Sequence, residues 1–224
     1  MAVTRLDSDE RRKAIVRAAV PLFARKGFAG TTTRELAEAG GISEALLFRH
    51  FPSKQLLYQE ILQLGCEGDP ALEQLARLEP STKTLVCMVR FMVRHFVLED
   101  SEPEQDSRLR LELHSYLEDG EYARQLFETV SERVIPLFEA SLAAAIAAGD
   151  VVPRPGAAAN RFWFAHHVAA LIAFADLPGD RSIPYRGGLA TVADEAIIFI
   201  LRGIGMTDAA IAAGAAGALK SAAD

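Results

Sequence analysis

The sequence predicts an all-α protein. Half of its 224 residues are hydrophobic, and many of these are alanine or leucine. Apolar residues recur at three- and four-residue steps, which is the period of an amphipathic helix. No sustained alternation of β-branched residues calls for a sheet. We therefore expect helices throughout, in a chain long enough for one large or two modest domains.

The first predicted helix opens at Asp7, with Glu10 beside it in the first turn. Its apolar stripe includes Ile15, Leu22 and Phe23, which lie on one face of a helix. Gly27 is expected to end this helix, because glycine accepts conformations that other residues avoid. The helix should therefore pack one face against the segment that follows.

Residues 31–51 predict two short helices joined by a tight turn. Thr32 is placed to cap the first helix, with Glu35 as the partner in a capping box. The glycine pair that starts at Gly40 ends this helix, and Ser43 caps the second. Two capped helices this close together form a helix-turn-helix, whose second helix normally lies in the major groove of DNA.

The second helix of this motif has two different sides. Leu47 and Phe51 are four residues apart and should face a small core. The residues expected to line the groove are Glu44, Ala45, Leu46 and Arg49. An arginine can donate two hydrogen bonds to guanine, and a leucine can touch the methyl group of thymine. The residues expected to contact the DNA backbone are Thr33, Phe48, His50 and Lys54.

This N-terminal segment resembles the TetR family of bacterial transcriptional regulators. The matching residues are Gly27-Phe28, Thr32-Thr33, Leu36-Ala37, Gly40, Ser43, Leu47-Phe48, His50-Phe51 and Lys54. The resemblance implies a three-helix DNA-binding domain at 1–53, with the helix-turn-helix at 32–51. It also implies a larger helical domain at 54–224 for effector binding and dimerisation. In the family, the position of Arg34 often reaches DNA from the first helix of the motif. Thr32 and Ser43 are also expected to contact DNA.

Three residues of the motif differ from the usual family pattern. Phe48 stands where a tyrosine is common, so a hydrogen bond to phosphate is lost. Ala45 stands where glycine is common, and Leu46 where threonine is common. We expect these differences to change which operator is bound, without abolishing DNA binding.

The charge of the chain is distributed unevenly. The net charge is −6, which is unusual for a DNA-binding protein. Residues 1–56 nevertheless hold ten lysines and arginines against six acidic residues, a balance of +4. The remaining 14 basic and 24 acidic residues give the rest of the chain a balance of −10. Attraction to phosphate supplies most non-specific affinity for DNA, so the basic segment is the expected DNA-binding surface.

The remainder of the chain resembles the family only in length and helical content. Further helices are predicted at 54–64, 82–99, 109–120 and 121–148. The acidic run 99–106 is predicted as a loop, and Pro136 is expected to bend the last of these helices. In the family, the helix at 54–64 couples the body of the protein to the DNA-binding domain.

Two strongly apolar helices are predicted near the end of the chain, at 157–175 and 189–205. The first is apolar almost all round, which indicates burial on more than one side. TetR-like proteins build a four-helix dimer interface at this place, so we expect a homodimer through these two helices. The alternative is that both are core helices of a monomer. The alanine-rich tail 207–221 predicts a further, weak helix.

Aromatic residues, methionines and histidines of the predicted body helices are candidates for a small-molecule site. The candidate residues are Met88, Phe91, Met92, His95, Phe96, Leu113, Tyr116, Phe127, Phe138, Trp163, Phe164 and His167. Such side chains suit a small, mostly apolar ligand. The same set would also serve as an ordinary core. Only the family resemblance favours a pocket, and it identifies no ligand.

Enzymatic activity and metal binding have little support in the sequence. The GxSxG, P-loop, GxGxxG and HExxH motifs do not occur. His95 with Glu99 and His114 with Glu118 have helical i, i+4 spacing, but two ligands do not make a metal site. We expect no cofactor and no metal. Cys66 and Cys87 are expected to be reduced, partly buried thiols in a cytoplasmic protein without a membrane span.

The sequence thus predicts a homodimeric, ligand-responsive repressor of transcription that binds a pseudo-palindromic DNA operator. Two alternatives remain. One is a small-molecule-binding protein whose helix-turn-helix is only structural, an idea that the missing tyrosine hydroxyl at Phe48 supports. The other is a helical enzyme, which would require a pair of titrating groups in one cavity.

Overall fold

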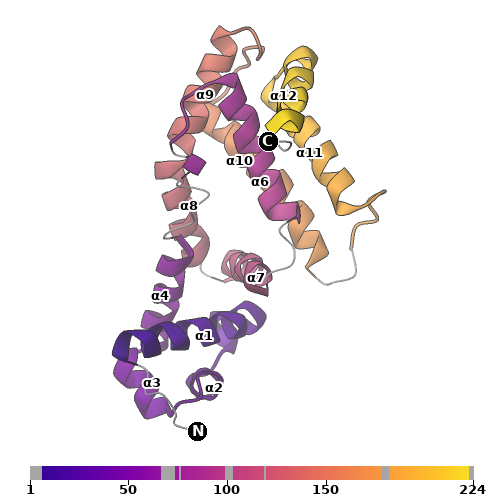
Figure 1. Cartoon of the computed structure of the whole chain (residues 1–224). Helices are drawn as coiled ribbons and strands as arrows, with labels where there is room; N and C mark the ends of the chain where they lie inside the picture. The colour runs from indigo at the N-terminus through magenta and orange to yellow at the C-terminus, as the bar shows by residue number, and fades with distance from the viewer. Residues whose placement is uncertain are drawn as a thin grey trace. The chain divides into compact units, whose positions relative to one another are not determined.

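The computed structural model describes residues 7–66, 74–75, 77–98, 103–118, 120–177 and 182–221. Within these ranges the regular structure is helical, apart from one isolated β-bridge between Val151 and Met206. The all-α prediction is therefore confirmed. The chain forms two compact units (Figure 1). The first comprises Met1–Gly68 and Glu102–Glu128, and the second comprises Asp69–Ser101 and Thr129–Asp224.

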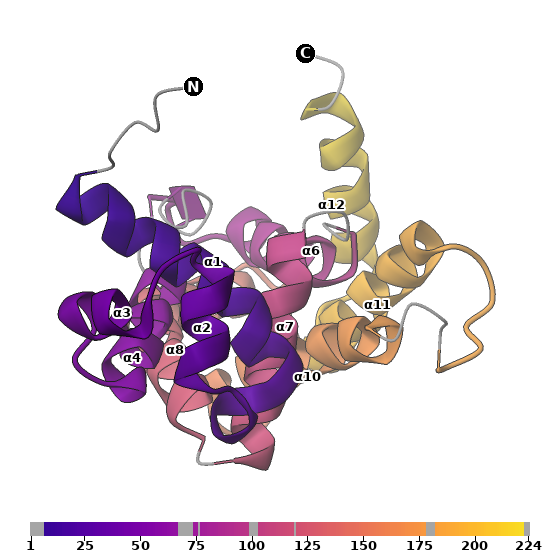
Figure 2. The same cartoon turned by 90° about the horizontal axis from the view of Figure 1, so that it is seen from below.

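The first unit contains the N-terminal helices (Figure 2). Its helices are α1 (Ser8–Gly30), α2 (Thr33–Ala39), α3 (Glu44–His50), α4 (Lys54–Cys66), α7 (Pro103–Leu117) and most of α8 (Glu121–Arg133). Asp7 caps α1 in a capping box with Glu10, as the sequence indicates. Helix α1 packs along α7 and also contacts α2 and α4.

The core of the first unit joins α1 to the helices that follow it. Phe23, Leu36, Phe51 and Leu57 are each no more than 1% exposed and belong to one apolar cluster. The ring of Tyr58 lies 5.0 Å from that of Phe23, in an edge-to-face arrangement. Aromatic pairs of this geometry add stabilisation beyond the burial of their area. The short helices α2 and α3 are therefore attached to a well-packed base.

The second unit is built around α6 (Thr82–Leu98). This helix packs against α9 (Ile135–Ala147), α10 (Ala158–Asp176) and α11 (Leu189–Ile204). Helix α12 (Asp208–Ser221) contacts α11 and α6. The core includes the fully buried side chains of Leu85, Val89, Val93 and Phe138. The helices predicted at 82–99, 157–175, 189–205 and 207–221 are confirmed to within one or two residues.

The predicted acidic loop at 99–106 is wrong in part. Helix α7 already begins at Pro103, and it ends at Leu117 rather than at residue 120; residues 99–102 lie outside the described part of the chain. Proline suits the first turn of a helix, and acidic residues there interact favourably with the helix dipole. The acidic run thus includes the start of a helix. The helix predicted at 121–148 is divided at Val134 into α8 and α9, and Pro136 lies in the first turn of α9, where proline is tolerated.

The two compact units do not coincide with the predicted division at residue 53. Contacts place α4 and α7 in the same unit as the three N-terminal helices, and α8 is divided between the units after Glu128. The sequence boundary between a DNA-binding domain and a second domain therefore stays a prediction.

Candidate nucleic-acid interface

Capping hydrogen bonds fix the two helices of the helix-turn-helix. The backbone N–H of Glu35 donates to the Thr32 hydroxyl at 3.3 Å, and the N–H of Thr32 donates to the Glu35 carboxylate at 3.0 Å. The N–H of Leu46 donates to the Ser43 hydroxyl at 3.2 Å. Between the helices, Gly41 has a φ of 62°, which glycine adopts at little cost. The predicted caps and turn are therefore confirmed.

Helix α3 has one buried and one exposed side. Leu47 is 2% exposed and packs in the core of the first unit together with Phe51, as predicted. The exposed residues of α3 and its cap are Ser43, Glu44, Ala45, Phe48 and Arg49. Leu46 and His50 are half-buried. Three of the four residues predicted to line a groove are thus exposed in this unit, and their contact with bases stays a prediction.

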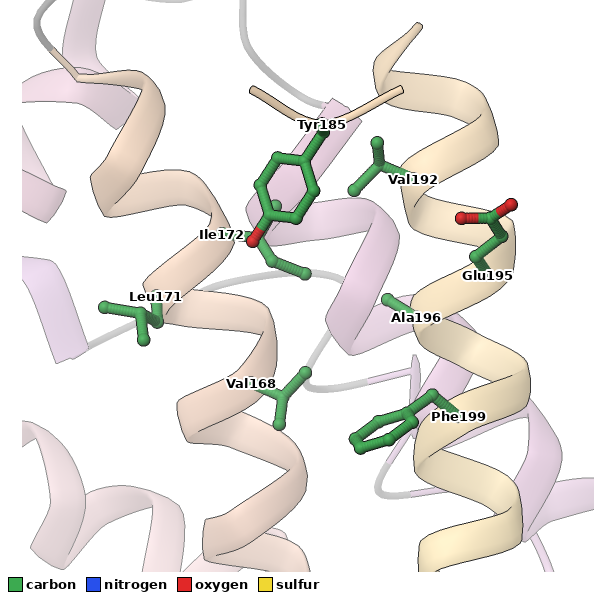
Figure 3. A pocket seen from close by; sticks show the side chains of 8 residues that line it. All are labelled: Val168, Leu171, Ile172, Tyr185, Val192, Glu195, Ala196 and Phe199. Atoms are coloured by element: carbon green, nitrogen blue, oxygen red, sulfur yellow. The ribbon is translucent and has the colours of Figure 1, made fainter. Parts of the chain in front are cut away.

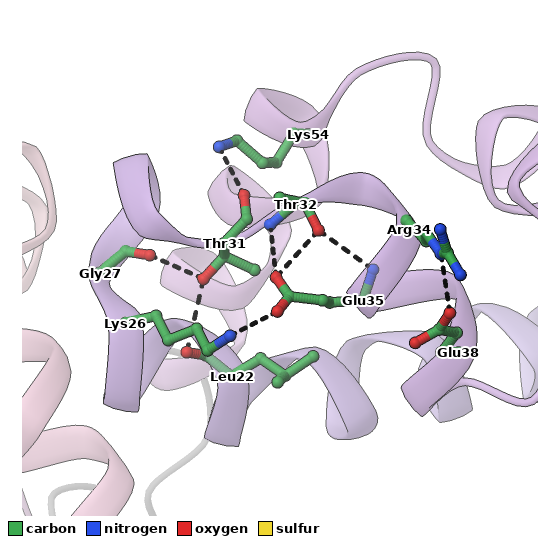
Figure 4. Close-up of polar contacts among 9 residues, drawn as sticks. All are labelled: Leu22, Lys26, Gly27, Thr31, Thr32, Arg34, Glu35, Glu38 and Lys54. Carbon is green, nitrogen blue, oxygen red and sulfur yellow. Dashed lines mark hydrogen bonds and ion pairs between the residues drawn. The ribbon is translucent and has the colours of Figure 1, made fainter.

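Two ion pairs lie at α2 (Figure 4). Lys26 of α1 pairs with Glu35, and the Arg34 Nε donates to the Glu38 carboxylate at 3.0 Å. The Lys26 ammonium and the donors of Thr32 lower the pKa of Glu35 to about 2. Arg34 and Glu38 are both exposed, and a pair of this kind contributes little to stability. Arg34 can therefore exchange Glu38 for a phosphate, and its contact with DNA stays a prediction.

Lys54 contacts the protein itself in a way that the sequence did not indicate (Figure 4). Its Nζ donates to the carbonyl oxygen of Phe28 at 2.6 Å and to that of Thr31 at 2.9 Å. The ammonium also lies 4.2 Å from the centroid of the Phe28 ring. An ammonium has three donors, and two of them are used here. Lys54 thus connects the start of α4 to the segment between α1 and α2, and its contact with a phosphate stays a prediction.

The break in α1 is held by the C-terminal end of α7. The backbone N–H of Phe28 donates to the Glu118 carboxylate at 3.2 Å. Gly27 has φ 68° and ψ 176°, a conformation that is essentially restricted to glycine. A Cβ added at Gly27 would collide with Glu118 Oε1 and would lie 3.2 Å from His114 Nδ1. Gly27 therefore ends the regular part of α1, as predicted, and also permits the close approach of Glu118.

The predicted ligand residues belong to both units. Leu113, Tyr116 and Phe127 lie in the first unit. The other candidate residues lie in the second unit, where Met88 and Met92 are buried in the core. Four of the second-unit residues form a series of ring contacts with one residue that was not selected, His166. The contacts are Phe91–His95 at 5.6 Å, His95–Phe96 at 5.7 Å, Phe96–His166 at 5.1 Å and Trp163–His166 at 5.8 Å.

His166 and His167 are adjacent but differ in environment. His166 is 6% exposed, and burial together with the neighbouring His167 lowers its pKa to about 4. His167 is exposed on α10, although its ring lies 5.6 Å from that of His166. The two adjacent histidines therefore lie on different faces of α10. The sequence offered no signal that His166, rather than His167, is the buried one.

A buried carboxyl group in α7 was also missed. Glu112 is 3% exposed, and its Oε1 accepts a hydrogen bond of 3.1 Å from the Tyr116 hydroxyl. Burial raises the pKa of Glu112 to about 7 and also raises the pKa of Tyr116. An acidic residue in an amphipathic helix ordinarily indicates an exposed face, so the sequence pattern concealed this group.

His166 should make the stability of the second unit depend on pH. Its folded-state pKa lies below the ordinary value near 6.5, so the unfolded chain binds more protons and stability is lost as the pH falls from about 6.5 towards 4. Glu112 acts in the opposite direction, because its raised pKa favours folding at low pH. We therefore expect the free energy of unfolding to fall, between pH 7 and 4.5, by about 2 kcal/mol more in the wild type than in His166→Asn.

Urea unfolding at the two pH values measures this difference. Glu112→Gln is the matched control, because Glu112 acts in the opposite direction. This substitution should change the pH dependence of the free energy of unfolding with the opposite sign. Equal pH dependence in the wild type and in His166→Asn would contradict the assignment to His166.

Helices α10 and α11 carry an exposed apolar face. Phe164 and Leu171 of α10 are 66% and 63% exposed, and Phe199 of α11 is 68% exposed. A groove of about 350 Å³ lies between the two helices (Figure 3). The groove is lined by Val168, Leu171, Ile172, Tyr185, Val192, Glu195, Ala196 and Phe199. None of the twelve candidate ligand residues lines this groove, whereas most of the lining belongs to the helices predicted to form a dimer.

Three further observations concern the chemistry of the described residues. Nowhere among them do three or more His, Cys, Asp or Glu side chains gather where a metal ion could bind. None of the helices in the same part of the chain is long and apolar enough to cross a membrane. Cys87 is exposed, so the expectation of a partly buried thiol is wrong at this position.

Known proteins resemble the N-terminal part of this chain. Residues 15–61 match the family described as bacterial regulatory proteins, tetR family. The nucleoid occlusion factor SlmA of Vibrio campbellii is 30% identical over 125 residues, which are 55% of this chain and 62% of SlmA. The HTH-type transcriptional regulator AcrR of Shigella flexneri is 30% identical over 112 residues, which are 49% of this chain and 50% of AcrR. The chain thus spans less than two thirds of the length of either relative.

A solved structure has a similar fold over most of the chain. It is AibR in complex with isovaleryl coenzyme A and operator DNA, with a TM-score of 0.63, 19% identity, and coverage of 84% of this chain and 96% of AibR. The fold and the capped helices define an all-α helix-turn-helix protein. The similarity to the tetR family of bacterial regulatory proteins covers residues 15–61, which include this helix-turn-helix.

Proposed function

We propose that this protein is a transcriptional regulator that binds operator DNA as a homodimer and acts as a repressor. The observation that carries the proposal is the exposed side of α3, which presents Glu44, Ala45, Phe48 and Arg49 while Leu47 anchors the helix in the core. Glutamate can accept from cytosine N4, arginine can donate to guanine, and apolar side chains can contact thymine methyl groups. The basic balance of residues 1–56 supplies attraction to phosphate.

Selection from a random library of DNA duplexes tests the proposal directly. The wild-type protein should enrich a pseudo-palindromic duplex, and fluorescence anisotropy should show affinity that falls steeply with salt. A scrambled duplex of the same length and composition is the reference for non-specific binding. Equal affinity for the selected and the scrambled duplex would favour the alternative of a helix-turn-helix that is only structural.

Arg49→Ala should relax base preference at one position of each half-site. Loss of a bidentate contact with guanine costs about 1–3 kcal/mol of discrimination against the wrong base. Lys54→Ala should instead weaken binding to all duplexes alike, because Lys54 holds the turn before α2 and has one donor left for a phosphate. Anisotropy across single-base operator variants separates the two results. Identical profiles for the two substitutions would contradict this assignment of roles.

The dimer in this proposal forms through α10 and α11. Their exposed apolar side chains would lose contact with water when two copies meet, which is favourable. Two copies related by a two-fold axis can place two α3 helices in successive major grooves, as a palindromic operator requires. A second copy of this chain therefore accounts for both the exposed face and the geometry of DNA binding.

The proposed effector is a small, mostly apolar molecule bound near the ring cluster of the second unit. The low pKa of His166 keeps its imidazole neutral at pH 7, so its edge-to-face contacts with Phe96 and Trp163 join uncharged rings. The related AibR structure contains both isovaleryl coenzyme A and operator DNA. Trp163 is the single tryptophan of the chain, so its fluorescence should respond to such a ligand. The Trp163→Phe variant removes the signal and is the control.

A further inference from the structure

Arg12 connects three helices of the first unit. Its Nε and Nη2 donate to the two carboxylate oxygens of Glu60, at 3.0 Å and 2.8 Å. Its Nη1 donates to the carbonyl oxygen of His50 at 2.7 Å. The guanidinium carbon lies 4.2 Å from the centroid of the Phe51 ring. Since Arg12 lies on α1, His50 at the end of α3 and Glu60 on α4, one side chain joins all three helices.

The contact at His50 is a helix C-cap made by a distant residue. The last carbonyl groups of a helix have no partner within it, and the C-terminal end carries partial negative charge. The Arg12 guanidinium satisfies one of these carbonyls with a charged donor. It also lies against the ring of Phe51, which is 1% exposed and therefore fixed by the core. The end of α3 is thus held at a defined place relative to α1.

Glu60 orients the guanidinium. A carboxylate that accepts two parallel hydrogen bonds fixes both the position and the plane of an arginine. Hydrogen bonding with Glu60 raises the pKa of Arg12, and the same contact lowers the pKa of Glu60. Asp9, one turn before Arg12, adds a further favourable charge. A shift of Glu60 with α4 would therefore move the guanidinium and, through it, the end of α3.

We propose that Arg12 and Glu60 are positioning residues that couple the placement of α4 to that of α3, and so set the sequence specificity of DNA binding. The inference depends on the proposed function, because it concerns how α3 is presented to DNA. Glu60 acts through Arg12, and Arg12 acts through His50; neither side chain needs to contact a base. Arg12, which would otherwise be counted among the basic residues available to phosphate, has an internal role.

A charge swap distinguishes this arrangement from a simple ion pair. Arg12→Glu combined with Glu60→Arg would retain two opposite charges on α1 and α4. It would, however, place a carboxylate beside the His50 carbonyl and the negatively polarised face of the Phe51 ring. A simple ion pair would be restored by the swap, whereas the three-helix contact would not.

The test compares affinity for two duplexes, one selected by the wild-type protein and one scrambled. Partial unfolding lowers both affinities by the same factor, so their ratio does not change when a substitution affects stability alone. We expect Arg12→Ala, Glu60→Ala and the charge swap each to reduce the ratio by about tenfold or more. Arg12→Lys should also reduce it, because an ammonium lacks the planar fork. Glu60→Gln, which retains one acceptor, should lie closer to the wild type.

Arg11→Ala is the matched control, since it removes an equal charge one position away and should leave the ratio unchanged. A wild-type protein that selects no duplex would overturn both the proposed function and this inference. A wild type that selects a duplex, with Arg12→Ala and Arg12→Lys retaining the wild-type ratio, would overturn only the inference. Full recovery of the ratio in the charge swap would also overturn it.

Discussion

Phe199→Glu should convert the proposed dimer into a folded monomer and abolish tight binding to a duplex with two half-sites. Phe199 is 68% exposed on the apolar face of α10 and α11, so a polar side chain is tolerated there in the monomer. In a dimer, the new carboxylate would be removed from water without a partner, which is costly. Loss of the second half-site contact removes a gain in affinity of about 10²- to 10⁴-fold. Sedimentation velocity and anisotropy measure the two effects.

Leu117→Glu is the matched control for this substitution. Leu117 is more exposed than Phe199, at 83%, but lies on α7 rather than on α10 or α11. The control variant should therefore remain dimeric. If Phe199→Glu sedimented as a dimer and kept wild-type affinity for DNA, the proposed interface would be wrong.

Gly27→Ala should lower the free energy of unfolding by about 2–3 kcal/mol. The φ of 68° with ψ of 176° is strained for any residue with a Cβ. The added methyl group would also displace the Glu118 carboxylate from the backbone N–H of Phe28. The strain and the lost hydrogen bond act together, so the expected effect exceeds either alone. Chemical denaturation monitored by circular dichroism measures the change.

Two further variants separate the causes of this loss. Gly41 has a similar φ of 62°, but no atom lies within 4 Å of an added Cβ. Gly41→Ala should therefore cost only the penalty of a left-handed conformation, about 1–2 kcal/mol. Glu118→Ala removes the hydrogen bond without backbone strain and should also cost less than Gly27→Ala. Equal losses in Gly27→Ala and Gly41→Ala would show that the contact with Glu118 contributes nothing.

The helix-turn-helix could be predicted because local rules determine it. The Thr32–Glu35 capping box, the Ser43 cap and the glycine turn involve partners no more than five residues apart. The side of α3 that faces the core follows from helical spacing. Lys54 and Arg12 could not be assigned in this way. Their partners lie 23 to 48 residues away in sequence, and a lysine or arginine on a helix gives no sign of whether it meets solvent or a carbonyl group.

The sequence predicted only part of the set of aromatic side chains that cluster together, for a similar reason. Composition identified aromatic residues that do meet around His166, but it also included Leu113, Tyr116 and Phe127, which belong to the other compact unit. Hydrophobic spacing indicates which side chains are buried within a helix. It does not indicate which helix becomes the neighbour, and that choice decides which rings share one cluster.

The two buried titrating groups, Glu112 in the first unit and His166 in the second, have a consequence for the chain as a whole. With pKa values of about 7 and about 4, they respond to acidification with opposite signs and similar size. Acidification would therefore stabilise the first unit and destabilise the second. The combined contribution of these two groups to the free energy of unfolding would stay almost constant. A measurement of the total free energy of unfolding would miss this change. The number of unfolding transitions, one or two, would reveal it.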